Sequence, residues 1–213
     1  SHRAMNAEVV ETLALPDCQI AYLENQRTKG ASGAWNTALD YLLEEAEATE
    51  HLFVAILDDD DSWSCEYLAR CGEMAHDLQL DMVAADLLRF ERIQGPPLYN
   101  QSPERLAVED FLVGNPGIQG SNLFLRFSVL LAAGRFDEGL RSTTDRDLCI
   151  RISELGSVRY RRLPQALVRH FADSDRSRLS ICGSPAKLDG LTAFWRKYAG
   201  RMSADQQRAF VDR

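Results

Sequence analysis

Four consecutive carboxylates, Asp58 to Asp61, directly follow an apolar run at 52–57 (LFVAIL). Such a run is typical of a strand buried on both faces, and four carboxylates at its end are costly unless something neutralises them. In extended backbone alternate side chains face the same way, so we expect Asp58 and Asp60 to converge while Asp59 points elsewhere. Two convergent carboxylates suit a hard divalent cation such as Mg²⁺ or Mn²⁺.

The acidic run also has a plain structural interpretation. It would then be an acidic turn, in which Asp61 or Ser62 caps a helix predicted at 63–78. A cap at either residue is compatible with a metal site at Asp58 and Asp60, so the two interpretations stay open at this point.

A second carboxylate, Asp145, stands at the start of a helix predicted at 144–155, with Thr143 or Thr144 as its N-cap. The helix N-terminal dipole favours the ionised carboxylate, and a charged carboxylate that faces a cleft can act as a general base. The alternative is that Asp145 only caps and charges the first turn. Asp147 points in a different direction on the helix, and we expect it to support the site or to bind.

Helical and extended patterns alternate along the first ~170 residues, which predicts an α/β fold. The remaining expected helices are at 30–49, 105–112, 128–133, 185–198 and 204–211. The expected strands are at 18–23, 52–57, 81–90, 119–125 and 157–171, with a loop at 94–103.

Composition narrows the class of protein further. The chain has 213 residues and a formal net charge of −8, which argues against nucleic acid as a partner. Its longest apolar stretches are far below the ~18 residues of a membrane span, and no targeting segment is visible. Five cysteines without a C-x-x-C pair indicate reduced packing residues rather than disulfides or a zinc site. We therefore expect a cytoplasmic protein, and localisation at the inner membrane surface is the alternative.

Five segments resemble, in order and spacing, those of family-2-type glycosyltransferases of the GT-A fold. The acidic run with its flanks, 57–63 (LDDDDSW), resembles the DxD segment of that family. Upstream, 25–36 (NQRTKGASGAWN) resembles the glycine-containing segment beside the nucleotide-sugar. Three downstream segments resemble the acceptor-side half of that family: 120–124 (GSNLF), 134–138 (GRFDE) and 144–148 (TDRDL). The resemblance covers about residues 1–171.

This resemblance implies a mostly parallel central sheet with one antiparallel strand, flanked by helices and followed by a C-terminal helical tail. It also implies metal-dependent, inverting transfer of a sugar from a nucleoside-diphosphate donor, of the UDP type, to a hydroxyl of a sugar, lipid-linked or protein acceptor. By resemblance Asp145 is the base, and the metal ligands are Asp58, Asp60 and His170. Donor contacts would come from Gly30, Asn36, Asp58, Asp59 and Asp60, and acceptor contacts from Gly120, Ser121, Asp147 and Trp63.

Taken alone, several of these residues have structural alternatives. His170 could be an ordinary hydrogen-bonded side chain, and Trp63 could be buried against the first helix. The sequence also departs from the family, with Trp35 in place of an Arg, Arg135 in place of a Gly, and Thr144 in place of a Glu.

The family begins with a strand, a P-x-x-N turn and a second strand ending in D-D-G-S, and this chain begins where that Ser falls. We therefore expect a GT-A-like domain at 1–171 without the first βαβ unit, and a C-terminal helical extension at 172–213. A sheet without inner strands exposes its edges, so we expect either a longer polypeptide or a second copy of the chain that forms a homo-oligomer.

Two other functions stay open. A non-catalytic nucleotide- or carbohydrate-binding relative is favoured by the missing first unit, Trp35 and Thr144. A different metal-dependent phosphoryl or nucleotidyl transfer enzyme explains the acidic run but gives no purpose to 134–147.

Overall fold

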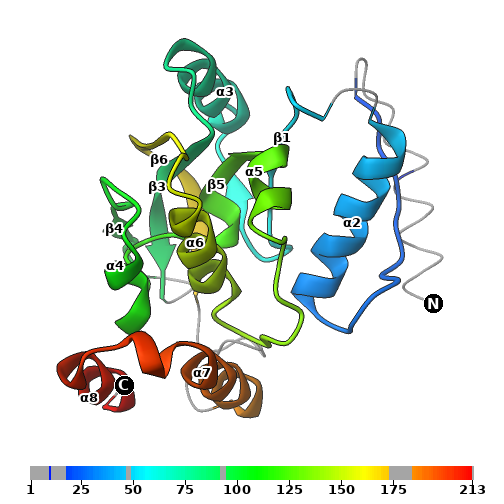
Figure 1. Ribbon diagram of the computed structural model, residues 1–213. Helices are drawn as coiled ribbons and strands as arrows, with labels where there is room; N and C mark the ends of the chain where they lie inside the picture. The colour runs from blue at the N-terminus through cyan, green and yellow to red at the C-terminus, as the bar shows by residue number, and fades with distance from the viewer. Residues whose placement is uncertain (1–9, 11–17, 47–48, 92–94, 173–183, 213) are drawn as a thin grey trace. The chain divides into compact units, whose positions relative to one another are not determined.

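A computed structural model describes residues 10, 18–46, 49–91, 95–172 and 184–212 of the chain (Figure 1). The chain forms two compact units, residues 1–46 and residues 47–213. Helices α7 and α8 of the C-terminal tail belong to the second unit, and the domain boundary expected at 171/172 stays a prediction.

The first unit is described from residue 18 onward and is centred on helix α2 (Ala31–Glu45). Gly30 stands at the N-cap with φ 132°, a conformation that favours glycine. Gly33 is needed for another reason, because a Cβ there would lie 1.9 Å from the carbonyl oxygen of Thr28. The strand predicted at 18–23 is wrong, since the structure assigns no strand to 19–23.

The second unit is built on a mixed sheet, which in the described residues has six strands. These are β1 (Phe53–Ala55), β2 (Ser62–Trp63), β3 (Met82–Phe90), β4 (Leu98–Asn100), β5 (Leu123–Arg126) and β6 (Tyr160–Phe171). The order is β1–β5–β3–β6–β2, and β4 pairs with β3. The two longest strands, β3 and β6, pair in parallel, and β1 runs in the same direction.

The predicted α/β class and the C-terminal helices are confirmed, whereas the expected single antiparallel strand is wrong. Three short strands, β2, β4 and β5, run opposite to β1, β3 and β6. Strands β2 and β4 were missed because two and three residues are too short for a periodic pattern, and β4 lies in the predicted loop at 94–103. The common direction of β1 and β6 nevertheless puts their carboxyl ends at one edge of the sheet, where α/β proteins bind ligands.

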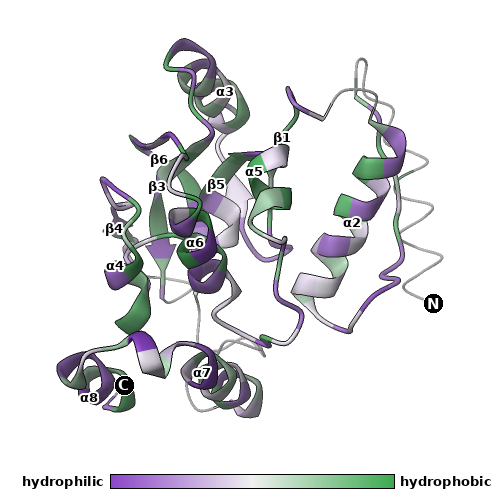
Figure 2. Ribbon diagram, in the orientation of Figure 1, coloured by the Kyte–Doolittle hydropathy of each residue, from purple (hydrophilic) through white to green (hydrophobic). Residues whose placement is uncertain are grey.

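Helices pack around this sheet as Figure 1 shows. Helix α3 contacts β3 and β6, α5 contacts β5 and α6, and α4 contacts α6 and α8. Their bounds are α3 (Tyr67–Asp77), α4 (Val108–Val113), α5 (Phe127–Ala132), α6 (Thr144–Glu154), α7 (Pro185–Tyr198) and α8 (Ala204–Val211). Strands β3 and β5 are predominantly hydrophobic (Figure 2), and they form the core with the buried residues Tyr67, Cys71, Val83, Leu87, Phe124 and Val168. In the parts described here, no helix combines the length and the apolar character needed to cross a bilayer.

A buried ion pair fixes the pairing of β3 with β6. Asp86, which has no exposed surface, accepts hydrogen bonds from Arg162 Nε at 2.7 Å and Nη2 at 2.6 Å, from the Ser102 backbone N–H at 2.8 Å, and from the Tyr99 hydroxyl. Burial raises the pKa of Asp86, but the hydrogen bonds from Arg162 and Tyr99 outweigh it and leave that pKa below its ordinary value. The pair stands where the β3–β6 register shifts, so it ties the two strands together at that irregularity.

The cysteines agree with the expectation of reduced thiols. Cys18, Cys65, Cys71 and Cys149 are free, and Cys182 lies outside the described residues.

Candidate active site

The acidic run forms a tight turn that Ile56 and Leu57 separate from the end of β1. The Asp61 backbone N–H donates to the Asp58 carbonyl oxygen at 3.0 Å, and this turn brings oxygens of Asp58, Asp60 and Asp61 within 4.8 Å of one another. Asp58 and Asp60 therefore converge as predicted, but through a turn and not through strand alternation. Asp59 is exposed and lies outside the cluster.

Asp61 is held by the end of β6. Its two carboxylate oxygens lie 3.1 and 3.0 Å from His170 Nδ1, and it accepts the Phe171 backbone N–H at 3.0 Å. Burial raises the pKa of Asp61, but the hydrogen bond and the charge of His170 bring it below its ordinary value. The predicted cap at Asp61 or Ser62 is wrong, because α3 begins only at Tyr67 and Ser62 lies in β2.

Asp58 has the opposite electrostatic character. Burial, followed by repulsion from Asp61 and Asp60, raises its pKa to about 6. Its backbone N–H is fixed by the Ser121 hydroxyl oxygen at 3.1 Å. The cluster is thus an accumulation of negative charge that a cation would relieve.

Asp145 lies in the first turn of α6, within range of the charges of Asp58 and Asp61. Burial and, next, the charge of Asp58 raise its pKa to about 7, while His170 and Lys187 act in the opposite direction. The expected N-cap position is confirmed for Thr143, but its hydroxyl donates to the Ser142 carbonyl and makes no cap bond. The helix dipole favours the ionised form of Asp145, but burial and the charge of Asp58 leave its pKa above the ordinary value.

The metal-free protein is expected to lose stability as the pH rises from about 5 to about 8. Asp58 and Asp145 have folded-state pKa values of about 6 and about 7, both above the ordinary 3.8, so in this window the folded chain holds more protons than the unfolded chain. The free energy of unfolding should therefore fall by about 4 kcal/mol, since the two groups together titrate over about three pKa units within this window. Carboxyls with lowered pKa, such as Asp61 and Asp86, titrate below this window.

Because Mn²⁺ binds deprotonated carboxylates, it should raise the melting temperature more at about pH 8 than at about pH 5. Differential scanning fluorimetry at both pH values, with MnCl₂ and with MgCl₂, checks this prediction. Equal stabilisation by the metal at the two pH values would contradict it.

The cluster fits a divalent cation by the chemistry of its donor groups. Carboxylate oxygens suit Mg²⁺ and Mn²⁺, and imidazole beside carboxylates suits Mn²⁺. His170 is only 8% exposed and its Nδ1 is fixed by Asp61. A carboxylate on one ring nitrogen is the partner that metal-ligating histidines commonly have, but the ring nitrogens of His170 lie outside the group formed by the oxygens of Asp58, Asp60 and Asp61.

Asp147 is buried and makes several contacts within the protein that the sequence did not predict. It has no exposed surface, and its oxygens lie 2.6 Å from Arg151 Nη2, 2.6 Å from Lys197 Nζ and 2.7 Å from the Tyr198 hydroxyl. These contacts favour a structural role for Asp147 over the predicted acceptor contact.

The other acceptor-side residues lie close to the acidic turn. Gly120 and Ser121 belong to a single 3₁₀ turn before β5 and not to the predicted strand. The Ser121 carbonyl accepts the Trp63 indole N–H at 2.7 Å, and one face of the Trp63 ring stacks on Tyr67 of α3 at 4.6 Å. Trp63 is thus buried in part against α3, whereas the alternative drawn from the sequence named the first helix.

The donor-side residues Gly30 and Asn36 belong to the first unit. Gly30 caps α2 and Asn36 is buried on that helix. Their contacts with a donor stay predictions.

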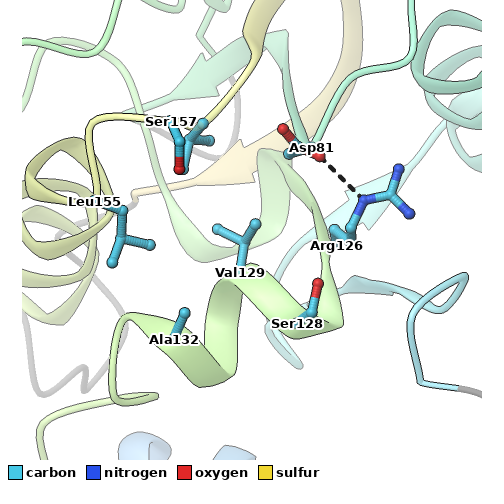
Figure 3. Close-up of a pocket in the computed structure, with 8 residues that line it drawn as sticks. Asp81, Arg126, Ser128, Val129, Ala132, Leu155 and Ser157 are labelled. Atoms are coloured by element: carbon cyan, nitrogen blue, oxygen red, sulfur yellow. Dashed lines mark hydrogen bonds and ion pairs between the residues drawn. The ribbon is translucent and has the colours of Figure 1, made fainter.

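A pocket of about 320 Å³ lies elsewhere in the second unit (Figure 3). Asp81 and Arg126, 3.1 Å apart, line it together with Val129, Leu155 and Ser157. Asp81 directly precedes β3 and Ser157 precedes β6, so the pocket lies at the amino ends of these strands, away from His170. None of the predicted site residues lines it.

Comparison with known proteins gives a family and a fold. The family model described as "Glycosyl transferase family 2" matches residues 6–129, more than half of the chain. The matched range contains the acidic turn, whereas Asp145 and His170 lie beyond it. None of the curated proteins compared with the chain matches it.

Three solved structures of TarS from S. aureus share the fold. TarS 1–349 in complex with UDP-GlcNAc has a TM-score of 0.56 at 13% identity, over 100% of this chain and 67% of that one. TarS 1–349 in complex with UDP has a TM-score of 0.52 at 16% identity, over 86% and 50%. A structure of TarS has a TM-score of 0.52 at 16% identity, over 86% and 31%. The chain thus spans between about a third and two thirds of these proteins.

Proposed function

The chain belongs to glycosyl transferase family 2, and from this membership we propose that it transfers a sugar from a nucleoside-diphosphate donor to an acceptor hydroxyl. The observation that carries the proposal is the electrostatic coupling of Asp145, on α6, to Asp58 in the acidic turn. A candidate base and a candidate cation site therefore share one region, although 87 residues separate them in the sequence.

Asp58 and Asp60 would hold Mn²⁺ or Mg²⁺, with His170 as a further ligand. Asp61 supports them, because it lies in the same cluster and fixes the His170 ring. A bound cation supplies Lewis-acid stabilisation of the charge that develops on the leaving diphosphate.

Asp145 acts as the general base. A base is most effective when its pKa lies near the working pH, and that of Asp145 is about 7. It takes the proton from the acceptor hydroxyl while the acceptor oxygen bonds to the anomeric carbon and the bond from that carbon to the diphosphate oxygen breaks. Attack opposite the leaving group inverts the anomeric configuration.

The donor is of the UDP type, a proposal supported by the crystal structures of TarS in complex with UDP-GlcNAc and with UDP. Gly30, Asn36 and Asp59 would add donor contacts, and Gly120, Ser121 and Trp63 would border a sugar, lipid-linked or protein acceptor. Ser121 also keeps Asp58 in place.

Turnover of the donor tests this function. Purified protein with UDP-GlcNAc and MnCl₂ is expected to release UDP slowly to water, and faster when a suitable hydroxyl acceptor is added. EDTA should stop the release. Binding of UDP without any UDP-GlcNAc turnover would instead favour the non-catalytic relative.

A further inference from the structure

The 3₁₀ turn Gly120–Asn122, directly before β5, is a rigid part of the second unit. Asn122 has no exposed surface, and its Nδ2 donates to the Ala85 carbonyl of β3 at 2.8 Å and to the Gly117 carbonyl at 3.0 Å. Its Oδ1 accepts the Gln119 backbone N–H at 2.8 Å. A buried amide whose donor and acceptor atoms are both bonded holds its surroundings in one arrangement, so this turn is a fixed support for the residues that pack on it.

Ser121, in the middle of this 3₁₀ turn, contacts the acidic turn on both of its flanks. The Asp58 backbone N–H donates to the Ser121 hydroxyl oxygen at 3.1 Å, and the Trp63 indole N–H donates to the Ser121 carbonyl at 2.7 Å. Asp58 is the first residue of the acidic turn, and Trp63 follows Asp61, its last residue, by two positions. One residue of a fixed support therefore holds both ends of the acidic turn.

The proton of the Ser121 hydroxyl is directed to the same turn. Burial raises the pKa of Asp61, whereas the hydrogen bond and charge of His170, followed by a hydrogen bond from Ser121, lower it. A hydroxyl accepts and donates at once, and Ser121 has no exposed surface. Its hydroxyl is therefore used entirely within the protein.

The acidic turn needs this support because its carboxylates repel one another. Oxygens of Asp58, Asp60 and Asp61 lie within 4.8 Å of one another, and like charges at this range disfavour the converged arrangement. A turn that was free to relax would let them separate, and a cation would then have to bring them together again, which lowers its affinity. A contact that keeps the turn converged before binding therefore strengthens binding.

We propose that Ser121 is a positioning residue of the cation site, whose hydroxyl and carbonyl hold the acidic turn in the converged form that Mn²⁺ or Mg²⁺ binds. This inference rests on the cation site of the function proposed above, and not on the transfer reaction. Since Ser121 has no exposed surface, its part on the acceptor side is to hold Trp63.

Calorimetric titration of MnCl₂ into the protein without donor tests this role directly. Ser121→Ala removes the acceptor of the Asp58 N–H, so the Kd for Mn²⁺ at about pH 8 should rise about tenfold, the effect of one hydrogen bond of a buried group. Ser121→Cys fills the same space with a much weaker acceptor and should stay within about threefold of Ser121→Ala. In UDP-GlcNAc turnover, the Mn²⁺ concentration for half-maximal rate should rise with the Kd, while kcat at saturating MnCl₂ stays within about threefold of the wild type.

Ser102→Ala is the matched control. Ser102 is only 3% exposed, and its hydroxyl donates to the Ala85 carbonyl at 2.8 Å and accepts from Asn122 Nδ2 at 3.1 Å. It is thus a buried serine of the same network, one step further from the acidic turn. This variant should lower the melting temperature of the metal-free protein about as much as Ser121→Ala does, with the Kd for Mn²⁺ within about twofold of the wild type.

A third variant tests the carbonyl contact and does not depend on the folding of the Ser121 variants. Trp63→Phe keeps an aromatic ring beside Tyr67 but removes the indole N–H that donates to the Ser121 carbonyl. The Kd for Mn²⁺ should rise about threefold.

The outcomes separate this role from the proposed function. A Kd for Mn²⁺ that is unchanged in Ser121→Ala, restored in Ser121→Cys, or raised equally in Ser102→Ala would overturn the role of Ser121. A wild-type protein that binds no Mn²⁺ would overturn the cation site, and the role of Ser121 with it. A wild-type protein that binds Mn²⁺ but turns over no donor, while Ser121→Ala binds Mn²⁺ more weakly, would support the role of Ser121 and contradict the proposed function.

Discussion

Replacement of Asp145 by Asn is expected to reduce UDP-GlcNAc turnover about a thousandfold, because a general base contributes roughly 10²–10⁴ to rate and an amide cannot accept the proton. Mn²⁺ and UDP affinity should stay within about threefold of the wild type, since Asp145 is outside the cation cluster. Initial rates of UDP release and calorimetric titration measure the two quantities.

The same variant should be more stable than the wild type without metal at neutral pH. Burial and the charge of Asp58 both disfavour the ionised form of Asp145, so removing this charge should raise the free energy of unfolding by about 1–2 kcal/mol, as often happens when a strained catalytic group is removed. Asp110→Asn is the matched control, because Asp110 is an exposed carboxylate in the first turn of α4. Full turnover in Asp145→Asn would remove this residue from the role of base.

Replacement of Asp60 by Ala is expected to abolish stimulation by Mn²⁺ and to lower donor turnover at least a hundredfold. Loss of one carboxylate from a cluster of three removes a ligand and a charge together, and cations such as Mg²⁺ and Mn²⁺ depend on both. The rise in melting temperature caused by Mn²⁺ should disappear as well.

Asp77→Ala is the control for Asp60→Ala, because Asp77 is an exposed carboxylate at the end of α3. It should keep both the stimulation and the thermal shift. Retention of Mn²⁺ stimulation in Asp60→Ala would exclude the acidic turn as the cation site. The charge effect of Asp58 on Asp145 would then no longer support the proposed function.

Periodicity and capping patterns predicted the tail and the α6 region well. The helices at 185–198 and 204–211 have the predicted bounds, and strand β3 and helix α6 differ by one residue. The prolines, serines and glycines at these ends act locally, so the local sequence is enough to place them.

Contacts between residues far apart in the chain could not be predicted from the sequence. The type and spacing of Asp58 and Asp60 indicated a convergent pair, but the role of Asp61 depends on His170, which only the pairing of β2 with β6 brings near. The packing of α7 on the segment before α6 carried no motif either, and it depends on the close approach of Gly190 to Ser142. The unbroken run of four carboxylates already indicated that Asp61 could join Asp58 and Asp60. Nothing in the sequence favoured a helix cap at Asp61 over a place in that cluster.

The hydrogen bond between Asp61 and His170 joins residues that are 109 positions apart. Closing so long a loop carries an entropic cost that is repaid only when the intervening strands have paired. During synthesis the acidic turn therefore emerges well before the histidine that fixes it. A nascent chain released before β6 would have the carboxylates of the acidic turn without the histidine and the Phe171 backbone N–H that hold Asp61. The acidic turn is therefore completed only after β6 has been made.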